Sequence, residues 1–229
     1  MTSERTDLAG LTTRIVGPAD AKLTVILMHG FGAPGDDLVG LAPYLNAPVR
    51  FVFPAAPLEL GGLYGDSRAW WLLDLARLEQ QLNSGGPAIR AAEVPEGLTA
   101  ARDHVMKLVD AVEARYPGPL VLGGFSQGAM VALDVALHRD TKPAGLLLMS
   151  GTLLAEPVWA PRFASLSGVP VLMSHGRQDQ LLPFSAAETL RDQLRAAGAK
   201  VEWVEFPGGH EIPPVVVDAA SKFLRALSC

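Results

Sequence analysis

The chain has 229 residues, of which 49% are apolar and 19% are charged, and its 24 acidic residues outnumber 19 basic ones to give a net charge of −5. The apolar content excludes a disordered chain, and the sequence lacks the clustered Lys and Arg that neutralise phosphates, so we expect no nucleic-acid partner. The only cysteine, Cys229, cannot form an intrachain disulfide or a thiolate metal site.

The first ten residues contain Glu4, Arg5 and Asp7 and lack the apolar run of a secretory signal. No apolar stretch approaches the ~18 residues that a membrane-spanning helix needs. We therefore expect a cytoplasmic protein without integral membrane association. The expected organisation is one domain over residues 1–229, in which only residues 1–10 could be disordered.

Short apolar runs rich in Val, Ile and Leu recur along the rest of the chain. Runs without polar alternation are typical of strands that are covered on both faces, so they predict a mostly parallel sheet. The predicted strands are residues 23–28, 49–53, 120–125, 144–149, 169–173 and 201–206.

Helical patterns lie between these strands. Residues 98–116 carry apolar side chains at helical spacing and end before Pro117, and residues 129–137 form a second helix. A capping box of Ser185 and Glu188 predicts a third helix, which ends before Gly198, and a last one opens near Pro213 and Pro214. Strands that alternate with helices predict an α/β fold with helices on both faces of the central sheet. Ligands bind at the carboxyl ends of the strands in such sheets, so the residues after each strand are the candidates for function.

Residues 124–128, Gly-Phe-Ser-Gln-Gly, join a predicted strand to a predicted helix and match the nucleophile elbow Gly-x-Ser-x-Gly. The glycines suit a sharp turn with no room for side chains, and the turn presents Ser126 at the N-terminus of a helix, where an oxyanion is stabilised. The alternative is a glycine-rich turn that happens to contain serine.

A serine hydroxyl needs a base and an acid, which follow the serine along the chain in this type of fold. His210 lies in a glycine-rich loop after the last predicted strand, and Asp179 follows the strand at 169–173. We expect Asp179 to orient His210 and His210 to activate Ser126. The alternatives are that His210 is an exposed surface residue and that Asp179 only stabilises its own turn.

The oxyanion hole is expected to use two backbone N–H groups, one from the residue after the nucleophile and one from the loop after an early strand. Gln127 supplies the first and Phe31 the second, and His29 is interpreted as structural.

Residues 152–168 are too few for a cap domain, so the longer stretch from 54 to 95 is the candidate cover of the site. Its apolar residues Trp70, Trp71, Leu72 and Leu73 could line a groove for an acyl chain, although the tryptophans could equally be core residues.

Five blocks of sequence occur together in one order. They are His29-Gly30-Phe31-Gly32 with Asp36-Asp37-Leu38, Arg68-Ala69-Trp70-Trp71 with Asp74, residues 123–129, His175-Gly176 with Asp179 and Pro183, and Gly209-His210-Glu211-Ile212. In these blocks the chain resembles the phospholipase/carboxylesterase family of α/β-hydrolases, which includes small bacterial carboxylesterases and acyl-protein thioesterases. The resemblance implies an α/β-hydrolase fold and ester or thioester hydrolysis by a catalytic triad of Ser126, Asp179 and His210. Phe31 and Ala129 depart from residues common in relatives, and the segment from Trp70 to Asp74 is longer than expected, which bears on acyl-chain preference.

We therefore expect a serine carboxylesterase of broad specificity that forms an acyl-enzyme on Ser126 and uses no metal or organic cofactor. The expected partner is a small-molecule or lipid-like ester, and the sequence does not predict the oligomeric state. One alternative is an acyl-protein thioesterase or lysophospholipase, which needs a groove for a fatty chain. Another is a non-catalytic, ligand-binding relative.

Overall fold

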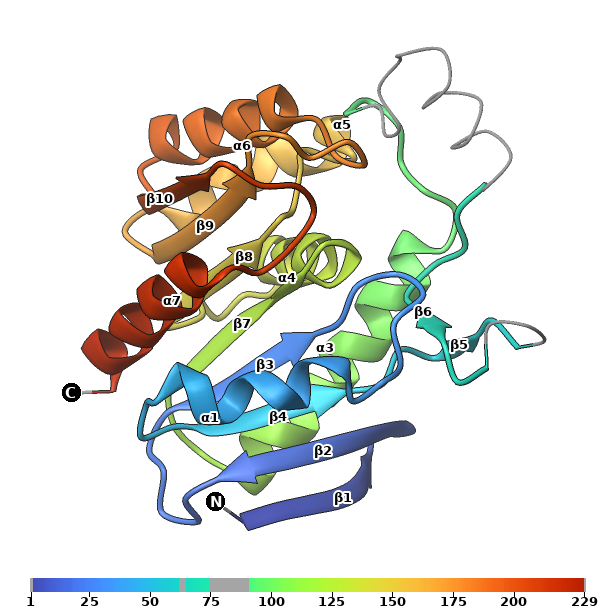
Figure 1. Cartoon of the computed structure of the whole chain (residues 1–229), viewed down its shortest axis with the longest axis vertical. Coiled ribbons are helices and arrows are strands. Elements are labelled where there is room, and N and C mark those ends of the chain that lie inside the picture. The colour runs from blue at the N-terminus through green and yellow to red at the C-terminus, as the bar shows by residue number, and fades with distance from the viewer. Residues whose placement is uncertain (1, 62–64, 75–90, 229) are drawn as a thin grey trace.

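An eight-stranded sheet forms the centre of the computed structural model, which describes residues 2–61, 65–74 and 91–228 (Figure 1). The strand order is β1-β2-β4-β3-β7-β8-β9-β10. The strands are β1 (Thr2–Leu8), β2 (Leu11–Gly17), β3 (Thr24–Met28), β4 (Arg50–Pro54), β7 (Leu120–Phe125), β8 (Gly145–Met149), β9 (Pro170–Gly176) and β10 (Lys200–Phe206).

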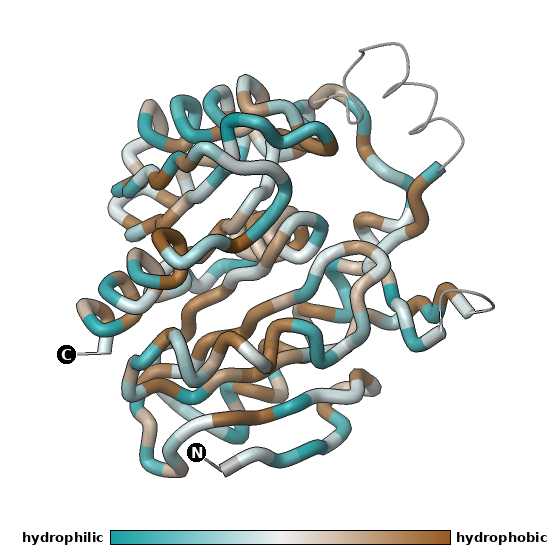
Figure 2. Tube along the Cα trace, viewed as in Figure 1, coloured by the Kyte–Doolittle hydropathy of each residue, from teal (hydrophilic) through white to brown (hydrophobic). Residues whose placement is uncertain are grey.

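The six strands from β4 to β10 in this order pair in parallel, which confirms the predicted mostly parallel sheet. Every residue of β3, β4 and β8 is buried, as expected for strands covered on both faces. In Figure 2 the hydrophobic residues accordingly concentrate along the central strands. A separate antiparallel pair, β5 (Leu58–Glu59) and β6 (Arg68–Ala69), lies beside the main sheet.

The N-terminal hairpin of β1 and β2 is missing from the predicted elements. Strands β1 and β2 are antiparallel and joined by seven residue pairs. Strand β2 also pairs with β4, so the hairpin extends the central sheet. Residues 2–8, which the sequence left open as a segment that could be disordered, therefore form a strand. The side chains of residues 3–8 are exposed or half-buried, so β1 carries no apolar run and is held mainly by backbone pairing with β2.

Helices cover both faces of the sheet, as predicted. One face packs against α3 (Leu98–Arg115), α4 (Gln127–His138) and α6 (Phe184–Ala196), and the other against α1 (Ala42–Leu45) and α7 (Pro214–Leu227). The sheet therefore separates two apolar clusters, one on each face. Successive side chains along a strand point alternately into one cluster and then the other. In β3, for example, Ile26 and Met28 face the first cluster, whereas Val25 and Leu27 face the second.

The predicted capping box at the start of α6 is wrong. The helix begins at Phe184, its N-cap is Pro183, and no side chain caps it, so Ser185 already lies inside the first turn. The predicted end is confirmed, because Gly198 follows the helix with a φ of 90°.

Residues 152–168 form no cap domain. This connection contains α5 (Glu156–Trp159) and a 3₁₀ helix over Ala160–Leu166, and its side chains Trp159, Phe163 and Leu166 are buried in the core. The carboxyl ends of the central strands are therefore not covered from this side. Within the described part of the chain, no helix combines the length and the apolar character needed to cross a bilayer.

Candidate active site

The turn between β7 and α4 holds Ser126 in an unusual backbone conformation, with φ 56° and ψ −120°. Such positive-φ conformations are costly for residues other than glycine and persist only where the surroundings impose them. Here the turn packs tightly against β3, and the glycines at positions 124 and 128 make this close packing possible. A Cβ at Gly124 would lie 2.4 Å from the carbonyl oxygen of Met28, and one at Gly128 only 2.0 Å from it. The predicted steric reason for both glycines is thus confirmed.

His210 and Asp179 meet although 31 residues separate them. The Nδ1–H of His210 donates to Oδ2 of Asp179 over 2.6 Å. The two loops are tied by their backbones as well, because the N–H groups of Arg177 and Gln178 donate to the carbonyl oxygens of Phe206 and Gly208, each over 2.9 Å. Strand β9 continues to Gly176, three residues beyond its predicted end, so Asp179 follows the true end of the strand closely.

Asp179 is fixed and ionised by its surroundings. Burial alone would raise the pKa of this carboxyl, but the hydrogen bonds from His210 and from the N–H of Leu182 outweigh burial, so its pKa lies below the usual value. Its second oxygen, Oδ1, accepts the N–H groups of Leu181 and Leu182, each over 2.9 Å. An ionised carboxylate at this place stabilises positive charge on the His210 ring.

A second imidazole lies beside this carboxylate. His175 is fully buried and donates from Nε2 to the carbonyl oxygen of Leu182 over 2.9 Å, and the same nitrogen lies 3.4 Å from Oδ2 of Asp179. Burial lowers the pKa of His175, so this ring is neutral near pH 7. The predicted strand ended at residue 173, whereas His175 belongs to β9 and packs beneath the loop that carries Asp179.

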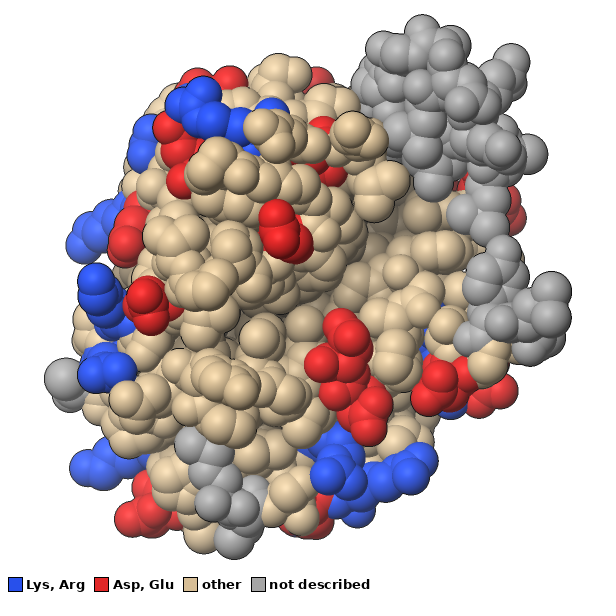
Figure 3. Space-filling model, in the orientation of Figure 1, with Lys and Arg blue, Asp and Glu red and all other residues tan. Residues whose placement is uncertain are grey.

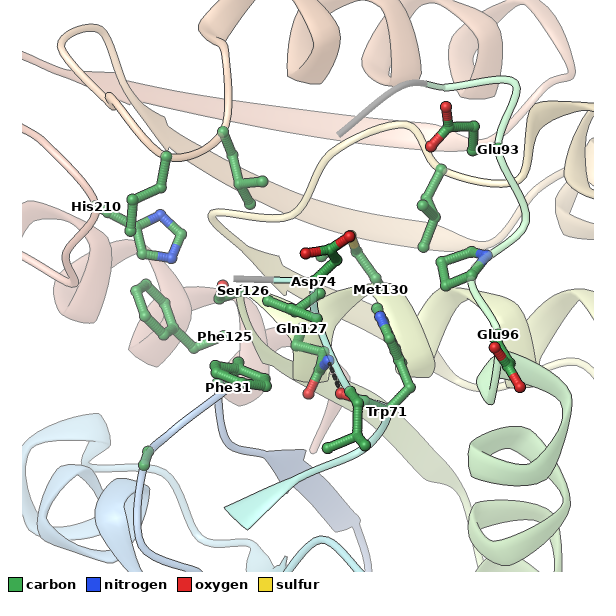
Figure 4. A pocket seen from close by; sticks show the side chains of 18 of the residues that line it. Phe31, Trp71, Asp74, Glu93, Glu96, Phe125, Ser126, Gln127, Met130 and His210 are labelled. Carbon is green, nitrogen blue, oxygen red and sulfur yellow. Dashed lines mark hydrogen bonds between the residues drawn. The ribbon is translucent and has the colours of Figure 1, made fainter. Parts of the chain in front are cut away.

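Ser126 and His210 line the same pocket, and Figure 4 shows the His210 ring directed towards the serine. The ring of Phe125 packs against that of His210 with 4.7 Å between centroids, which restricts the orientation of the imidazole. The hydrogen bonds of the described residues include none between Ser126 and His210. Such contacts are often open in unliganded enzymes and tighten when substrate binds.

The loop after β3 approaches Ser126 as expected for an oxyanion hole. Neither the N–H of Phe31 nor that of Gln127 donates to an acceptor in the described parts of the chain. The loop is held by His29, whose Nδ1–H donates to the carbonyl oxygen of Gly30 over 2.8 Å and whose Nε2 accepts the N–H of Ala56 over 3.0 Å. Burial lowers the pKa of His29, which keeps it in the neutral form that these two bonds require. These contacts support its interpretation as structural.

The side chain of Gln127 has a role that the sequence did not reveal. Its Oε1 accepts the N–H of Trp70 and its Nε2 donates to the carbonyl oxygen of Trp71, each over 2.9 Å, and the residue is 2% exposed. We call this pair of hydrogen bonds the Gln127 clamp. A buried amide signals that partners exist, but nothing in the sequence indicates that they lie more than fifty residues away.

A cavity of about 700 Å³ opens from Ser126, within the range of small-molecule sites. Trp71, Leu72 and Leu73 line it, as the sequence predicted. Trp70 does not: it is 1% exposed, and its Nε1–H donates to the carbonyl oxygen of His29, so it is a core residue. Lining residues that were not predicted include Asp37, Asp74, Glu93, Val94, Pro95, Glu96, Met130, Leu154, Leu181 and Leu182.

Of the predicted cover, residues 54–95, the cavity lining includes residues 71–74 and 93–95, and residues 62–64 and 75–90 lie outside the described residues. Residues 91–93 are fastened to the connection after β8, because the N–H groups of Ala155 and Glu156 donate to the carbonyl oxygens of Glu93 and Ala91. Figure 3 shows a hollow on this face, bordered by acidic side chains, with most Lys and Arg nearer the edge of the view.

The parallel sheet, the strained serine after β7 and the histidine and aspartate after β10 and β9 define an α/β-hydrolase. Comparison with known families agrees and is more specific. Residues 12–228 match the phospholipase/carboxylesterase family, and the chain belongs to this family of hydrolases.

Relatives of similar length include esterases and thioesterases. The chain is 27% identical over 231 residues to acyl-protein thioesterase 1 of Gibberella zeae, covering 95% of this chain and 96% of that protein. It is 29% identical to acyl-protein thioesterase 1 of Eremothecium gossypii, covering 90% and 88%. The crystal structure of esterase PE8 superposes with a TM-score of 0.78 at 29% identity, covering 95% and 99%. A carboxylesterase from Mesorhizobium loti, at 19% identity and a TM-score of 0.74 over 98% and 97%, shows the same fold.

Proposed function

We propose that the protein is a serine carboxylesterase that hydrolyses carboxylic esters through an acyl-enzyme on Ser126. The observation that carries this proposal is the 2.6 Å hydrogen bond between His210 and Asp179 in a pocket that also contains Ser126. The strained backbone at Ser126 supports it, since strain of this kind is maintained mainly at functional turns.

In the proposed reaction, Nε2 of neutral His210 takes the Ser126 proton as Oγ attacks the acyl carbonyl. Asp179 keeps the proton of His210 on Nδ1 and stabilises the imidazolium that forms. His210 then gives its proton to the departing alcohol, which leaves the acyl group on Ser126. Water repeats the sequence, releases the acid and restores the serine.

The developing oxyanion would accept the N–H groups of Phe31 and Gln127, which have no acceptor among the residues described. The N-terminus of α4 adds its positive dipole end at the same place. Each such donor contributes about 2.7 to 4 kcal/mol to lowering the barrier in comparable enzymes. The proposed machinery thus consists of three side chains and two backbone groups, and it uses no metal or organic cofactor.

The proposed substrate is a small-molecule or lipid-like ester with an uncharged acyl chain. Leu72, which is 65% exposed, and Val94 and Leu181 form an apolar border around the cavity. An acyl-protein thioesterase activity is the second candidate, because the relatives cited above carry that name and the chemistry on Ser126 would be the same. Lysophospholipase activity also requires a chain-binding groove, whereas a non-catalytic relative has no need of the ordered His210–Asp179 pair.

A fluorophosphonate probe followed by intact-mass measurement tests the proposal. We expect one adduct on the wild type, none on Ser126→Ala, and a fall in kcat of roughly 10⁶-fold for that variant. Ser185→Ala, at an exposed position of α6, is the matched control and should label normally. An adduct that persists in Ser126→Ala, or no adduct on the wild type, would contradict the proposal.

A panel of esters and thioesters separates the two activities. The rates for p-nitrophenyl butanoate and hexadecanoate, and for an S-hexadecanoyl peptide, are compared at equal concentration. We expect the butanoate to be hydrolysed fastest. A clear preference for the long-chain thioester would favour the thioesterase instead.

A further inference from the structure

The indole N–H of Trp71 is a hydrogen-bond donor without a partner. Trp71 is 1% exposed, and its Nε1 is buried and makes no hydrogen bond with any described residue. The same side chain forms part of the wall of the cavity that opens from Ser126, and Met130 lines this cavity as well (Figure 4). Buried donors are nearly always satisfied in folded proteins, so an unsatisfied one in a binding cavity needs an explanation.

The Trp71 backbone is held close to the nucleophile. The Gln127 clamp joins the carbonyl oxygen of Trp71 to the residue that follows Ser126. The indole of the preceding Trp70 is held as well, by its bond to His29. A side chain on so restrained a backbone presents its N–H at a defined place in the wall, which is the property that a specificity group requires.

The charges around the cavity restrict the acceptor that could satisfy this N–H. The carboxylates of Asp37 and Glu96 line the cavity, and its lining includes no Lys or Arg among the described residues. A substrate carboxylate would therefore be repelled, whereas an ether, keto or hydroxyl oxygen would not. Because Nε1 is buried, a ligand oxygen reaches it only where a lining side chain moves, and Met130, which lines the same cavity, is unbranched and flexible enough to do so.

We propose that the Trp71 indole N–H donates to an uncharged oxygen atom within the acyl chain, and that the preferred substrates are esters of neutral, oxygen-bearing acids. The proposal rests on the proposed esterase function and adds the class of acyl group. Trp71 is a specificity residue in this role: it takes no part in bond making or breaking, but distinguishes an oxygenated chain from a hydrocarbon chain of the same length.

The kinetic test compares p-nitrophenyl hexanoate with the isosteres in which one chain methylene in turn is replaced by oxygen. Each kcat/KM is divided by the rate of hydrolysis of the same ester by hydroxide, which removes differences in intrinsic reactivity. We expect at least one isostere to be preferred over hexanoate by roughly three- to tenfold, the effect of one hydrogen bond. The negatively charged monoester of hexanedioic acid should be poorer than hexanoate.

Trp71→Phe removes the donor and should reduce the preference ratio to about one. Trp203→Phe, which replaces a tryptophan on β10 that bonds to Glu205, is the matched control and should keep the wild-type ratio. A wild-type ratio of one, or a preference that survives in Trp71→Phe, would overturn the inference while leaving the esterase function intact. Inactivity toward every ester would overturn the proposed function itself.

A second measurement serves if Trp71→Phe does not fold. In Ser126→Ala labelled with [¹⁵N]tryptophan, the Trp71 indole proton should move downfield when the methyl ester of the preferred ether acid binds, but not with methyl hexanoate. An indole proton that contacts a long-lived internal water, with or without the ether ester, would contradict the inference, because water would then be the partner.

Discussion

Asp179 uses both carboxylate oxygens, one for the His210 ring and one for two backbone N–H groups of its own loop. These contacts determine which nitrogen of His210 carries the proton and which remains free to act as a base. The Asp179 side chain is 0% exposed, so solvent weakens these interactions little.

Asp179→Asn should lower kcat by about 10⁴-fold with little change in folding, because an amide N–H facing Nδ1 selects the wrong tautomer of His210. The measurement is the steady-state rate with p-nitrophenyl butanoate, together with circular dichroism. Asp192→Asn, on the exposed side of α6, is the control and should keep wild-type activity. A loss of less than tenfold for Asp179→Asn would contradict the proposed role.

Single residues differ in how far the sequence predicts their placement. Ser126, Asp179 and His210 were predictable because each follows a strand at the edge of the sheet where ligands bind. Trp70 and Trp71 were not distinguishable, since which of two neighbouring indoles reaches the cavity depends on backbone directions in an irregular segment. The structure places both indoles in the apolar core, and only Trp71 also lines the cavity.

The strand-turn-helix element of β7 and α4 depends on close contact with β3. Gly128 has no room for a side chain because the carbonyl oxygen of Met28 occupies the place of its Cβ. A backbone carbonyl cannot rotate away as a side chain could, so a substitution here has to move a whole element.

Gly128→Ala should therefore lower the free energy of unfolding by roughly 3 kcal/mol, the upper end for overpacked sites. It should also slow the reaction of Ser126 with fluorophosphonate, since the elbow must shift. Urea unfolding and labelling rates check both effects. Gly40→Ala, where an added Cβ meets nothing within 4 Å, should be neutral on both scales, and equal effects of the two variants would exclude the steric explanation.

Buried elements were predicted more accurately than exposed ones. Strands β7 and β8 match their predicted ranges to within one residue, because apolar runs report burial on both faces. Strand β1 was missed because its stability comes from backbone pairing, which leaves no trace in side-chain pattern. The false capping box before α6 shows that a two-residue motif is outweighed by the neighbouring Pro183, which already fixes the start of the helix.

At the scale of the whole molecule, two buried neutral histidines link stability to pH. Burial lowers the pKa of both His29 and His175, so the unfolded chain binds protons at these residues more readily than the folded one. The resulting stabilisation is fully present above the unfolded pKa of about 6.5 and is lost as the pH falls through the lower, folded-state values.

Urea midpoints should therefore decrease from about pH 7 to about pH 5, and His29→Gln should reduce this dependence. His104→Gln, at an exposed position of α3, is the matched control and should leave the slope unchanged. A wild-type midpoint that is constant over this interval would contradict the expectation. The cytoplasmic location and the extent of a single domain over residues 1–229 stay predictions from the sequence.

The Gln127 clamp has a consequence for anyone who wishes to redesign the acyl preference. Because one amide joins the turn that carries the nucleophile to the backbone of residues 70 and 71, mutant libraries built on that segment would disturb reactivity and selectivity together. Another part of the cavity wall, residues 93–96, is anchored instead to residues 155 and 156 through Glu93 and Ala91. Laboratory evolution directed at residues 93–96 should therefore change the acyl-chain preference and leave the reactivity of Ser126 unchanged.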